Sequence, residues 1–150
     1  MKLKRTLATL GSAAAMTVGL IGFSPAAHAA LPGCTDYAIY YSGSTNAWYA
    51  KVPTVGIQGN NDCTLRAGAS GMQVYHLQDS LSYCYGQDVG GWDGAFGAKT
   101  TAALKRVQAS LGLTADGVYG PQTRERMKWH WRNMEGAYNT CNTLSGAGAH

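Results

Sequence analysis

Four residues near two glycine-rich stretches have side chains suited to ligand binding: Trp92, Tyr119, Arg124 and Trp129. Trp and Tyr rings pack against the C–H faces of sugars, and Arg donates paired hydrogen bonds to carboxylates. This set favours a binding surface for a molecule that offers sugar faces or carboxylates. The alternative is a structural role, with both Trp side chains in the core or half-buried and Arg124 solvated.

The residue patterns that catalysis requires are missing from the sequence. It has no His-Glu-x-x-His motif, no Gly-x-Ser-x-Gly elbow and no Cys-x-x-Cys pair. His76 and His130 fit ordinary surface or packing residues better than ligands, and His150 has no carboxylate at zinc-ligand spacing. Glu125 stands between two Arg residues, which does not suit a glycosidase carboxylate pair. We therefore expect a protein that is not an enzyme and uses no metal or cofactor.

The candidate binding residues are positioned by a pattern that occurs twice. The pattern Asp-Gly-x-aromatic-Gly-x-x-Thr spans residues 93–100 and again residues 116–123. A Leu-Gln pair at 77–78 and a Val-Gln pair at 107–108 precede the two copies. Asp-Gly suits a tight turn because Asp bonds nearby backbone amides and Gly accepts positive φ, while the aromatic residue can pin the turn to the core. The phasing predicts a duplicated helix-turn unit in one small domain.

The first two predicted helices have clear boundary signals. Ser70 and Gln73 form a capping-box pair before an apolar stripe, which predicts a helix from about Gly71 to Tyr83. The second helix should begin at Ala98 and end before Gly112, which can supply a C-terminal stop.

The third predicted helix begins at Pro121, and Met127, Trp131 and Met134 share one of its faces. Residues 31–69 differ, because they contain many aromatic and small polar residues without a helical period. We expect a mainly α fold: a small three-helix domain with a pseudo-repeat and a loop-rich N-terminal extension tied by disulfides.

Residues 1–29 have the pattern of a secretory signal peptide. Basic residues at the start precede an apolar stretch, and Ala27-His28-Ala29 is a small-x-small cleavage site. Without the three basic residues of the signal, nine Lys and Arg (12 − 3) remain against eight acidic residues, a net charge of +1. We expect a secreted chain, extracellular or wall-associated, that binds neither nucleic acid nor, once cleaved, a membrane. Seven of the nine basic residues lie in 99–132, which suits an extracellular anionic polymer.

The four cysteines are even in number and follow an export signal, so two disulfides are expected. Three pairings are possible. Cys63 precedes the first predicted helix and Cys84 follows it, so a short extended segment could run back along the helix and join them. We predict the pairs Cys63–Cys84 and Cys34–Cys141.

Over residues 65–129 the chain resembles the type-1, three-helix family of peptidoglycan-binding modules. The resemblance rests on several elements in the right order: Gly68 and Gly71, Val74-x-x-Leu77-Gln78-x-x-Leu81, the two Asp-Gly-x-aromatic-Gly-x-x-Thr copies, Ala103-Leu104-x-x-Val107-Gln108 and Gly112-Leu113. It implies a domain over 65–134 that binds the glycan or the stem peptide of peptidoglycan, with an extension at 30–64 and a tail at 135–150.

Members of that family are usually noncatalytic modules attached to cell-wall hydrolases, whereas here we expect a stand-alone form. The resemblance therefore implies wall binding and leaves the purpose of that binding open. The principal alternative is a secreted protein-interaction factor, such as an inhibitor of an extracellular enzyme with a secreted protein partner. A cell-wall hydrolase is a further alternative.

Overall fold

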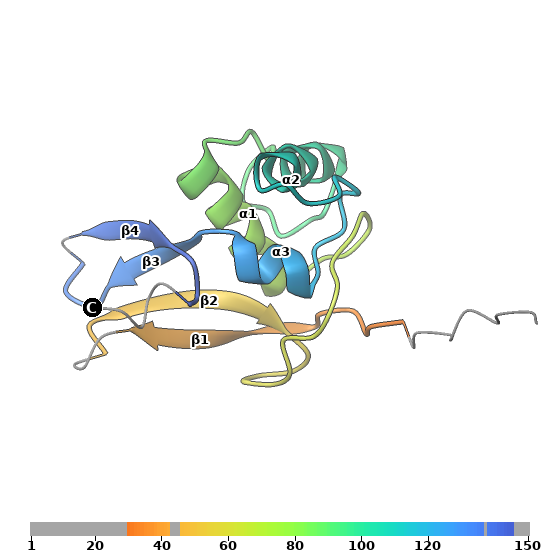
Figure 1. The fold of residues 1–150 in the computed structure, drawn as a ribbon. Helices are drawn as coiled ribbons and strands as arrows, with labels where there is room; N and C mark the ends of the chain where they lie inside the picture. The colour runs from red at the N-terminus through yellow and green to blue at the C-terminus, as the bar shows by residue number, and fades with distance from the viewer. Residues whose placement is uncertain (1–29, 43–45, 137, 146–150) are drawn as a thin grey trace, which may run out of the picture.

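The computed structural model describes residues 30–42, 46–136 and 138–145 (Figure 1). Three helices and four strands follow one another along the chain: β1 (Asp36–Ser42), β2 (Trp48–Thr54), α1 (Met72–Tyr85), α2 (Ala98–Ser110), α3 (Pro121–Arg126), β3 (Trp129–Asn133) and β4 (Asn139–Asn142). None of the described helices is both long and apolar enough to cross a membrane.

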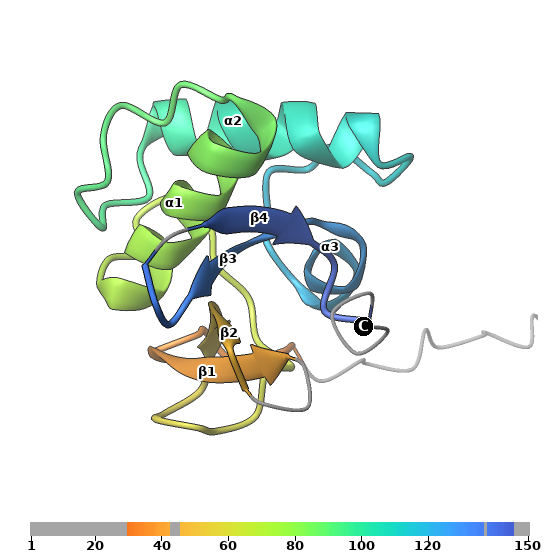
Figure 2. The ribbon, with the colours of Figure 1, turned by 90° about the vertical axis from the view of Figure 1, so that its left-hand side faces the viewer.

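The strands form one antiparallel sheet in the order β1-β2-β3-β4. Figure 2 shows α1 on one side of β3 and α3 on the other, and α2 lies over α1 away from the β1–β2 hairpin. The prediction of a mainly α fold is therefore wrong, because the domain combines its helices with a sheet that draws strands from both ends of the described chain.

The N-terminal extension is a hairpin and not the loop-rich segment that its composition suggested. Tyr37, Ile39 and Tyr41 alternate along β1 with Ala38, which is buried, and Tyr40. Aromatic and β-branched residues at alternate positions suit a strand because successive side chains point to opposite faces. On its β2 side the hairpin pairs with β3, which lies far along the sequence, so no local pattern reveals this strand partner.

The third helix ends much earlier than its apolar spacing predicted. Met127 already has an extended backbone, with ψ 152°, and Trp129 begins β3. His130 pairs with Cys141 of β4, while Trp129 and Trp131 bury their rings. Aromatic residues favour strands, and the tertiary pairing overrides the helical spacing.

The predicted starts of α1 and α2 agree with the structure to within one residue, but the predicted capping box is absent. Gly71 is the N-cap of α1, with φ 126°, and no side chain caps it. Instead, Gln73 donates from Nε2 to the backbone oxygens of Ser70 at 2.8 Å and Cys34 at 3.3 Å. Gln73 therefore ties the start of α1 to the N-terminal segment.

Two disulfides form as predicted, but the predicted pairing is wrong. The bonds are Cys34–Cys63 and Cys84–Cys141, with Cα–Cα distances of 5.0 Å and 5.6 Å. The Cys34 amide donates to the carbonyl of Thr64 at 2.9 Å, which places Cys34 beside Cys63. Strand β4 carries Cys141 next to β3, against which α1 packs, so Cys84 at the end of α1 reaches it.

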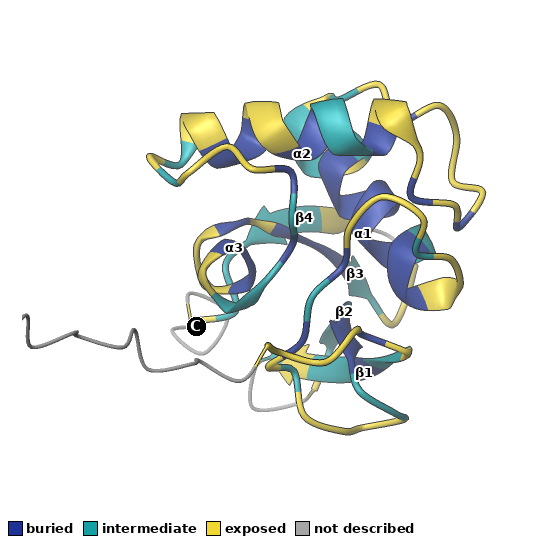
Figure 3. Cartoon of the chain, turned by 90° about the vertical axis from the view of Figure 1, so that its right-hand side faces the viewer, coloured by how far each residue is buried: buried dark blue, intermediate teal, exposed yellow. Residues whose placement is uncertain are grey.

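The core lies where α1, α2 and the sheet meet, and Figure 3 shows that the buried residues of α2 face α1. Helices α1 and α2 and strands β2 and β3 each contribute fully or nearly buried apolar side chains to one core, and Tyr40 of β1 packs against it. Its largest fully buried apolar members are Trp129, Tyr119, Leu65, Leu77, Leu81, Leu104 and Met127.

Candidate functional site

The first of the two repeated turns is held by the side-chain amide of Gln78 on α1. Its Nε2 donates to Asp93 Oδ1 at 2.9 Å, to the carbonyl of Ala95 at 3.0 Å and to Thr100 Oγ1 at 3.1 Å. Its Oε1 accepts from the amide of Gly94 at 2.9 Å. Gln78 is fully buried, so one side chain satisfies the polar groups inside the turn.

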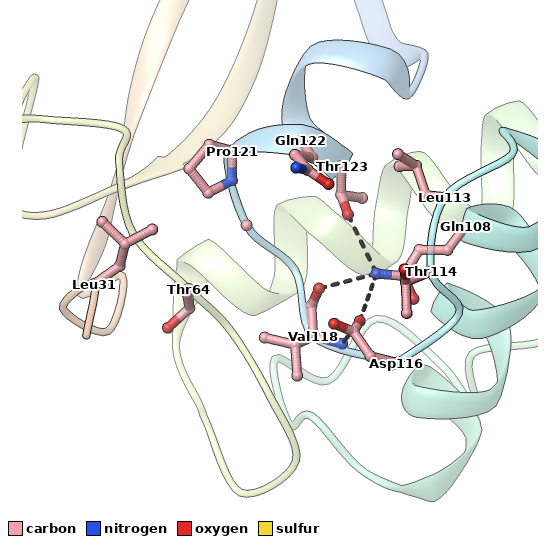
Figure 4. A pocket seen from close by; sticks show the side chains of 11 residues that line it. Leu31, Thr64, Gln108, Leu113, Thr114, Asp116, Val118, Pro121, Gln122 and Thr123 are labelled. Carbon is pink, nitrogen blue, oxygen red and sulfur yellow. Dashed lines mark hydrogen bonds between the residues drawn. The ribbon is translucent and has the colours of Figure 1, made fainter. Parts of the chain in front are cut away.

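The second turn repeats these bonds atom for atom (Figure 4). Gln108 on α2 donates from Nε2 to Asp116 Oδ1 at 2.9 Å, to the carbonyl of Val118 at 2.9 Å and to Thr123 Oγ1 at 3.2 Å. The amide of Gly117 donates to its Oε1 at 2.9 Å. The Asp, Gly and Thr positions of the repeated pattern are therefore structural, as their turn chemistry indicated.

Both turns are fastened to the segment that leads into α1. Leu65 and Tyr119 exchange backbone hydrogen bonds of 3.0 Å and 2.8 Å. The amide of Phe96 donates to the carbonyl of Ala69 at 2.9 Å, and the amide of Gly71 donates to the carbonyl of Gly94 at the same distance. This segment thus sets the position of one turn relative to the other.

Two of the four predicted binding residues lie in the core. Tyr119 and Trp129 are both 0% exposed, and their rings meet edge to face with centroids 6.1 Å apart. Burial raises the pKa of Tyr119, and its hydroxyl has no hydrogen-bond partner among the described residues. Neither ring can offer its face to a sugar, so the structural alternative holds for both.

Arg124 is also buried, and its charge is already paired. Its guanidinium contacts Asp62 Oδ1 at 3.1 Å and Glu125 Oε1 at 2.7 Å, and it donates to the backbone carbonyl of Asn61. Burial alone would lower the pKa of Arg124, but the hydrogen bonds with Glu125 and Asp62 outweigh burial and raise it. Arg124 is therefore a clamp between α3 and the N-terminal segment.

Trp92 is the predicted binding residue that the structure leaves accessible. Its side chain is 44% exposed on the loop before the first turn, and its ring meets that of Tyr75 edge to face at 6.1 Å. Trp92 does not adjoin the other three predicted residues in any described contact. The four residues are thus not brought together as one surface.

A groove opens instead beside the second turn, between the α2–α3 loop and the start of α3 (Figure 4). Two adjoining hollows of about 430 Å³ each form it, and they share Leu113, Thr114 and Gln122. We call this combined surface the α3 groove. Its other lining residues are Leu31, Thr64, Gln108, Gly112, Asp116, Val118, Gly120, Pro121, Thr123, Glu125 and Arg126.

Arg126 supplies the available positive charge of the α3 groove. It is exposed, and its guanidinium makes one long contact of 3.4 Å with the carbonyl of Leu111. The carboxylate of Glu125 lies in the same lining and accepts from Arg124, whose charge it shares with Asp62. With half-buried Leu113 and exposed Gln122 nearby, the groove combines an apolar surface, an amide and a cation.

A buried polar cluster lies on the opposite side of β3. Asp79 of α1 is 1% exposed and contacts His130 Nδ1 at 3.0 Å and Arg132 Nη2 at 2.6 Å. Burial raises the pKa of Asp79, but the hydrogen bond from His130 and the charge of Arg132 outweigh it, so the net pKa is lowered. His130 thus joins β3 to α1 through Asp79, whereas both ring nitrogens of His76 are shielded from solvent without a hydrogen-bond partner among the described residues, so His76 serves packing.

Sequence reasoning missed the clamping role of Gln78 and Gln108 and the lining role of Gln122 and Arg126. The available signal was that a Gln precedes each copy of the pattern, by 15 residues for Gln78 and by 8 for Gln108, since a buried amide can satisfy a turn's polar groups. For Gln122 and Arg126 the available signal was proximity to the second turn.

Comparison with known proteins identifies a family for the part of the chain that contains the two turns. A family model described as a putative peptidoglycan binding domain matches residues 70–127. A probable N-acetylmuramoyl-L-alanine amidase of Bacillus licheniformis is 42% identical over 62 residues, which are 38% of this chain and 18% of the amidase. The chain thus spans less than a fifth of the length of that relative.

Two further relatives match a larger share of their own length. An uncharacterized protein in the bpoA1 3′ region of Kitasatospora aureofaciens is 33% identical over 97 residues, covering 62% of this chain and 79% of the relative. The crystal structure of the SleB N-terminal domain is 40% identical, with a TM-score of 0.40, and covers 42% of this chain and 85% of that one. Through residues 70–127, the chain belongs to the peptidoglycan-binding domain family.

Proposed function

We propose that the mature chain is a secreted, noncatalytic module that binds bacterial cell-wall peptidoglycan. The observation that carries the proposal is the family match over residues 70–127, because this range contains both Gln-clamped turns and most of the α3 groove. The amidase that resembles this chain shares with it a segment that is 18% of the amidase's own length. The function that this chain shares with the family is therefore binding and not hydrolysis.

Export and domain organisation form part of the same proposal. Residues 1–29 lie outside the described residues, and their sequence pattern supports a signal peptide. The binding domain extends over 65–134, while residues 30–64 and the described part of 135–150 supply the remaining strands of the sheet. A secreted module of this kind would act outside the cell, at the wall.

The α3 groove suits a stem peptide better than a flat sugar surface. Arg126 can donate charge-assisted hydrogen bonds to a carboxylate, and the Gln122 amide can bond a peptide group. Leu113 and Val118 provide apolar contact for small side chains. Trp92 lies elsewhere and remains a proposed separate contact with the glycan.

The test is a titration of the mature protein with solubilised wall fragments that retain their stem peptides. Arg126→Ala should weaken binding about tenfold or somewhat more, because a charge-assisted hydrogen bond contributes about 1.5–3 kcal/mol. Lys128→Ala is the matched control, since Lys128 is exposed, lies two residues away and does not line the groove. Equal losses for both variants would mean diffuse charge attraction and would remove the groove from the proposal.

Two other results would contradict a part of this proposed function. Release of new reducing ends or free amines during prolonged incubation with wall would contradict the noncatalytic part. Retention of a secreted protein, with no retention on wall material, would favour the alternative of a protein-interaction factor.

A further inference from the structure

The β1–β2 hairpin lies outside the range that the family model matches and has a hollow of its own. The hollow has a volume of about 340 Å³ and is lined by Ile39, Tyr41, Tyr49, Lys51 and Met134. We call it the hairpin hollow. It is built by the sheet, whereas the α3 groove is built by the second turn and α3.

Strand register places the lining residues on one face. Tyr41 is paired directly with Tyr49, and Ile39 with Lys51, so each pair projects from the same side of the sheet. Tyr49 is also paired with Arg132 on β3, which extends the row across a third strand. Helix α1 covers the Arg132 end, because Asp79 bonds Arg132, but the side chain of Tyr41 remains 51% exposed.

Tyr41, which is exposed, and Tyr49, which is partly buried, lie side by side and provide a surface suited to a sugar ring. Tyr presents an apolar ring face together with a hydroxyl that can donate or accept a hydrogen bond. Met134 is 62% exposed and adds a flexible apolar contact at the border of the hollow. The lining thus offers partners for both parts of a saccharide: apolar rings for its C–H faces and Tyr hydroxyls for its hydroxyl groups.

Lys51 gives the hairpin hollow a positive charge. It is the charged residue of the lining, and within the described part of the chain it has no carboxylate partner. Its ammonium lies 5.1 Å from the centre of the Tyr37 ring, which holds it at the edge of the hollow. Lys51 and Tyr49 are two residues apart on β2, a separation of about 7 Å along a strand. A sugar ring on the tyrosines would therefore place a carboxylate on itself or on its neighbour within reach of Lys51.

We propose that the hairpin hollow is a second binding site, and that it takes an acidic saccharide: a glycan strand with free muramic acid carboxylates. The sugar rings lie on Tyr41 and Tyr49, and the carboxylate pairs with Lys51. This proposal extends the proposed function to a second surface of the same polymer. It assigns the glycan to the sheet and leaves the stem peptide to the α3 groove.

The test uses two soluble probes and nuclear magnetic resonance of the mature protein. One probe is the stem-free tetrasaccharide of alternating N-acetylglucosamine and N-acetylmuramic acid, and the other is the neutral tetramer of N-acetylglucosamine. The acidic probe should shift the signals of Tyr41, Tyr49 and Lys51. Tyr41→Ala should weaken its binding roughly three- to tenfold, and Lys51→Gln about tenfold, while Lys51→Gln should leave binding of the neutral probe unchanged.

Two control variants separate this site from the α3 groove. Ile57→Ala removes an 80% exposed apolar side chain outside the hollow and should leave binding of the acidic probe unchanged. Arg126→Ala should also leave it unchanged while weakening the binding of stem-bearing fragments. If neither probe shifts the hairpin signals, the second site is wrong even where the protein still binds whole wall. Equal binding of both probes, with no effect of Lys51→Gln, would overturn the assignment of an acidic saccharide.

Discussion

Gln78 and Gln108 each use both ends of one buried amide to hold a turn. Each Nε2 serves three acceptors, and each Oε1 accepts from the glycine amide of its turn. Removing such a side chain leaves several buried polar groups without partners, which costs more than the loss of one hydrogen bond. The two Gln residues therefore contribute to stability far more than their polar character suggests.

Gln108→Glu should lower the free energy of unfolding by about 2–4 kcal/mol. The replacement carboxylate cannot donate to the carbonyl of Val118, and it faces the carboxylate of Asp116 across a hydrogen-bond distance that is 2.9 Å in the native protein. Urea unfolding monitored by Trp fluorescence would measure the loss. Gln122→Glu is the matched control, because Gln122 is exposed, and its midpoint should move little. Equal midpoints for the two variants would contradict the clamp.

Arg124→Ala should destabilise the fold, in contrast to the expectation for a solvated ligand-binding Arg. Its guanidinium is buried between Asp62 and Glu125, while both carboxylates are more than half exposed and can be solvated when Arg124 is lost. The loss should be about 1–3 kcal/mol, between the values for exposed and buried pairs. Thermal unfolding should show a lower midpoint for Arg124→Ala and a native-like midpoint for Arg126→Ala. Unchanged stability of Arg124→Ala would contradict its role as a clamp.

His76 should make stability depend on pH between about 6.5 and 4. Burial, helped by the nearby charges of Lys51 and Arg132, lowers the pKa of His76 to about 4, while the charge of Asp79 acts in the opposite direction. The unfolded chain therefore binds a proton in this range that the folded chain does not, so stability is full above pH 6.5 and is lost as pH falls towards 4.

The measurement is the unfolding free energy at a series of pH values for the native protein and for His76→Gln. The neutral amide should flatten the dependence between pH 6.5 and 4 and leave the loss of stability at lower pH, where Asp79 with its lowered pKa takes up a proton. The rings of Tyr37 and Tyr75 contact His76 edge to face. The same slope in both proteins would exclude His76 as the cause.

At the scale of elements, the two disulfides join segments that the sheet brings together. Cys34–Cys63 closes 29 residues and Cys84–Cys141 closes 57. The chain-entropy relation gives about 3.6 and about 4.2 kcal/mol for loops of these sizes. Replacing both cysteines of the second pair by Ala should therefore destabilise slightly more than replacing both of the first. Unfolding of the two double variants would test the order, and peptide mapping without reduction should recover the Cys34–Cys63 peptide.

The helical starts and the repeated turns could be predicted because their signals are local. Gly97 before Ala98, and Gly120 before Pro121, mark helix starts through backbone preferences that act within a few residues. The end of α3 could not be predicted in the same way, because the apolar spacing of 127–134 fits a helix. Only the pairing of Trp129 and Trp131 with β4 makes this segment a strand. The pairing of β2 with β3 is likewise nonlocal and leaves no periodic signal.

The candidate site shows the same limit. Residue type predicted Tyr119, Arg124 and Trp129 as binding residues, but aromatic and Arg side chains are equally suited to bury against a core or to clamp a loop. Burial decides between these roles, and burial depends on packing across the whole domain. Trp92 remains accessible because it precedes the turn on an exposed loop.

At the scale of the whole molecule, residues 30–150 carry nine basic and eight acidic residues, a net charge of only +1. Nonspecific attraction to an anionic wall should therefore be weak, and wall binding should survive moderate salt. The most direct measurement is sedimentation of the mature protein with purified insoluble peptidoglycan at physiological salt. The account predicts saturable retention that Arg126→Ala weakens and Lys128→Ala does not. Absence of retention, or retention that disappears with salt equally for all three proteins, would contradict specific peptidoglycan binding.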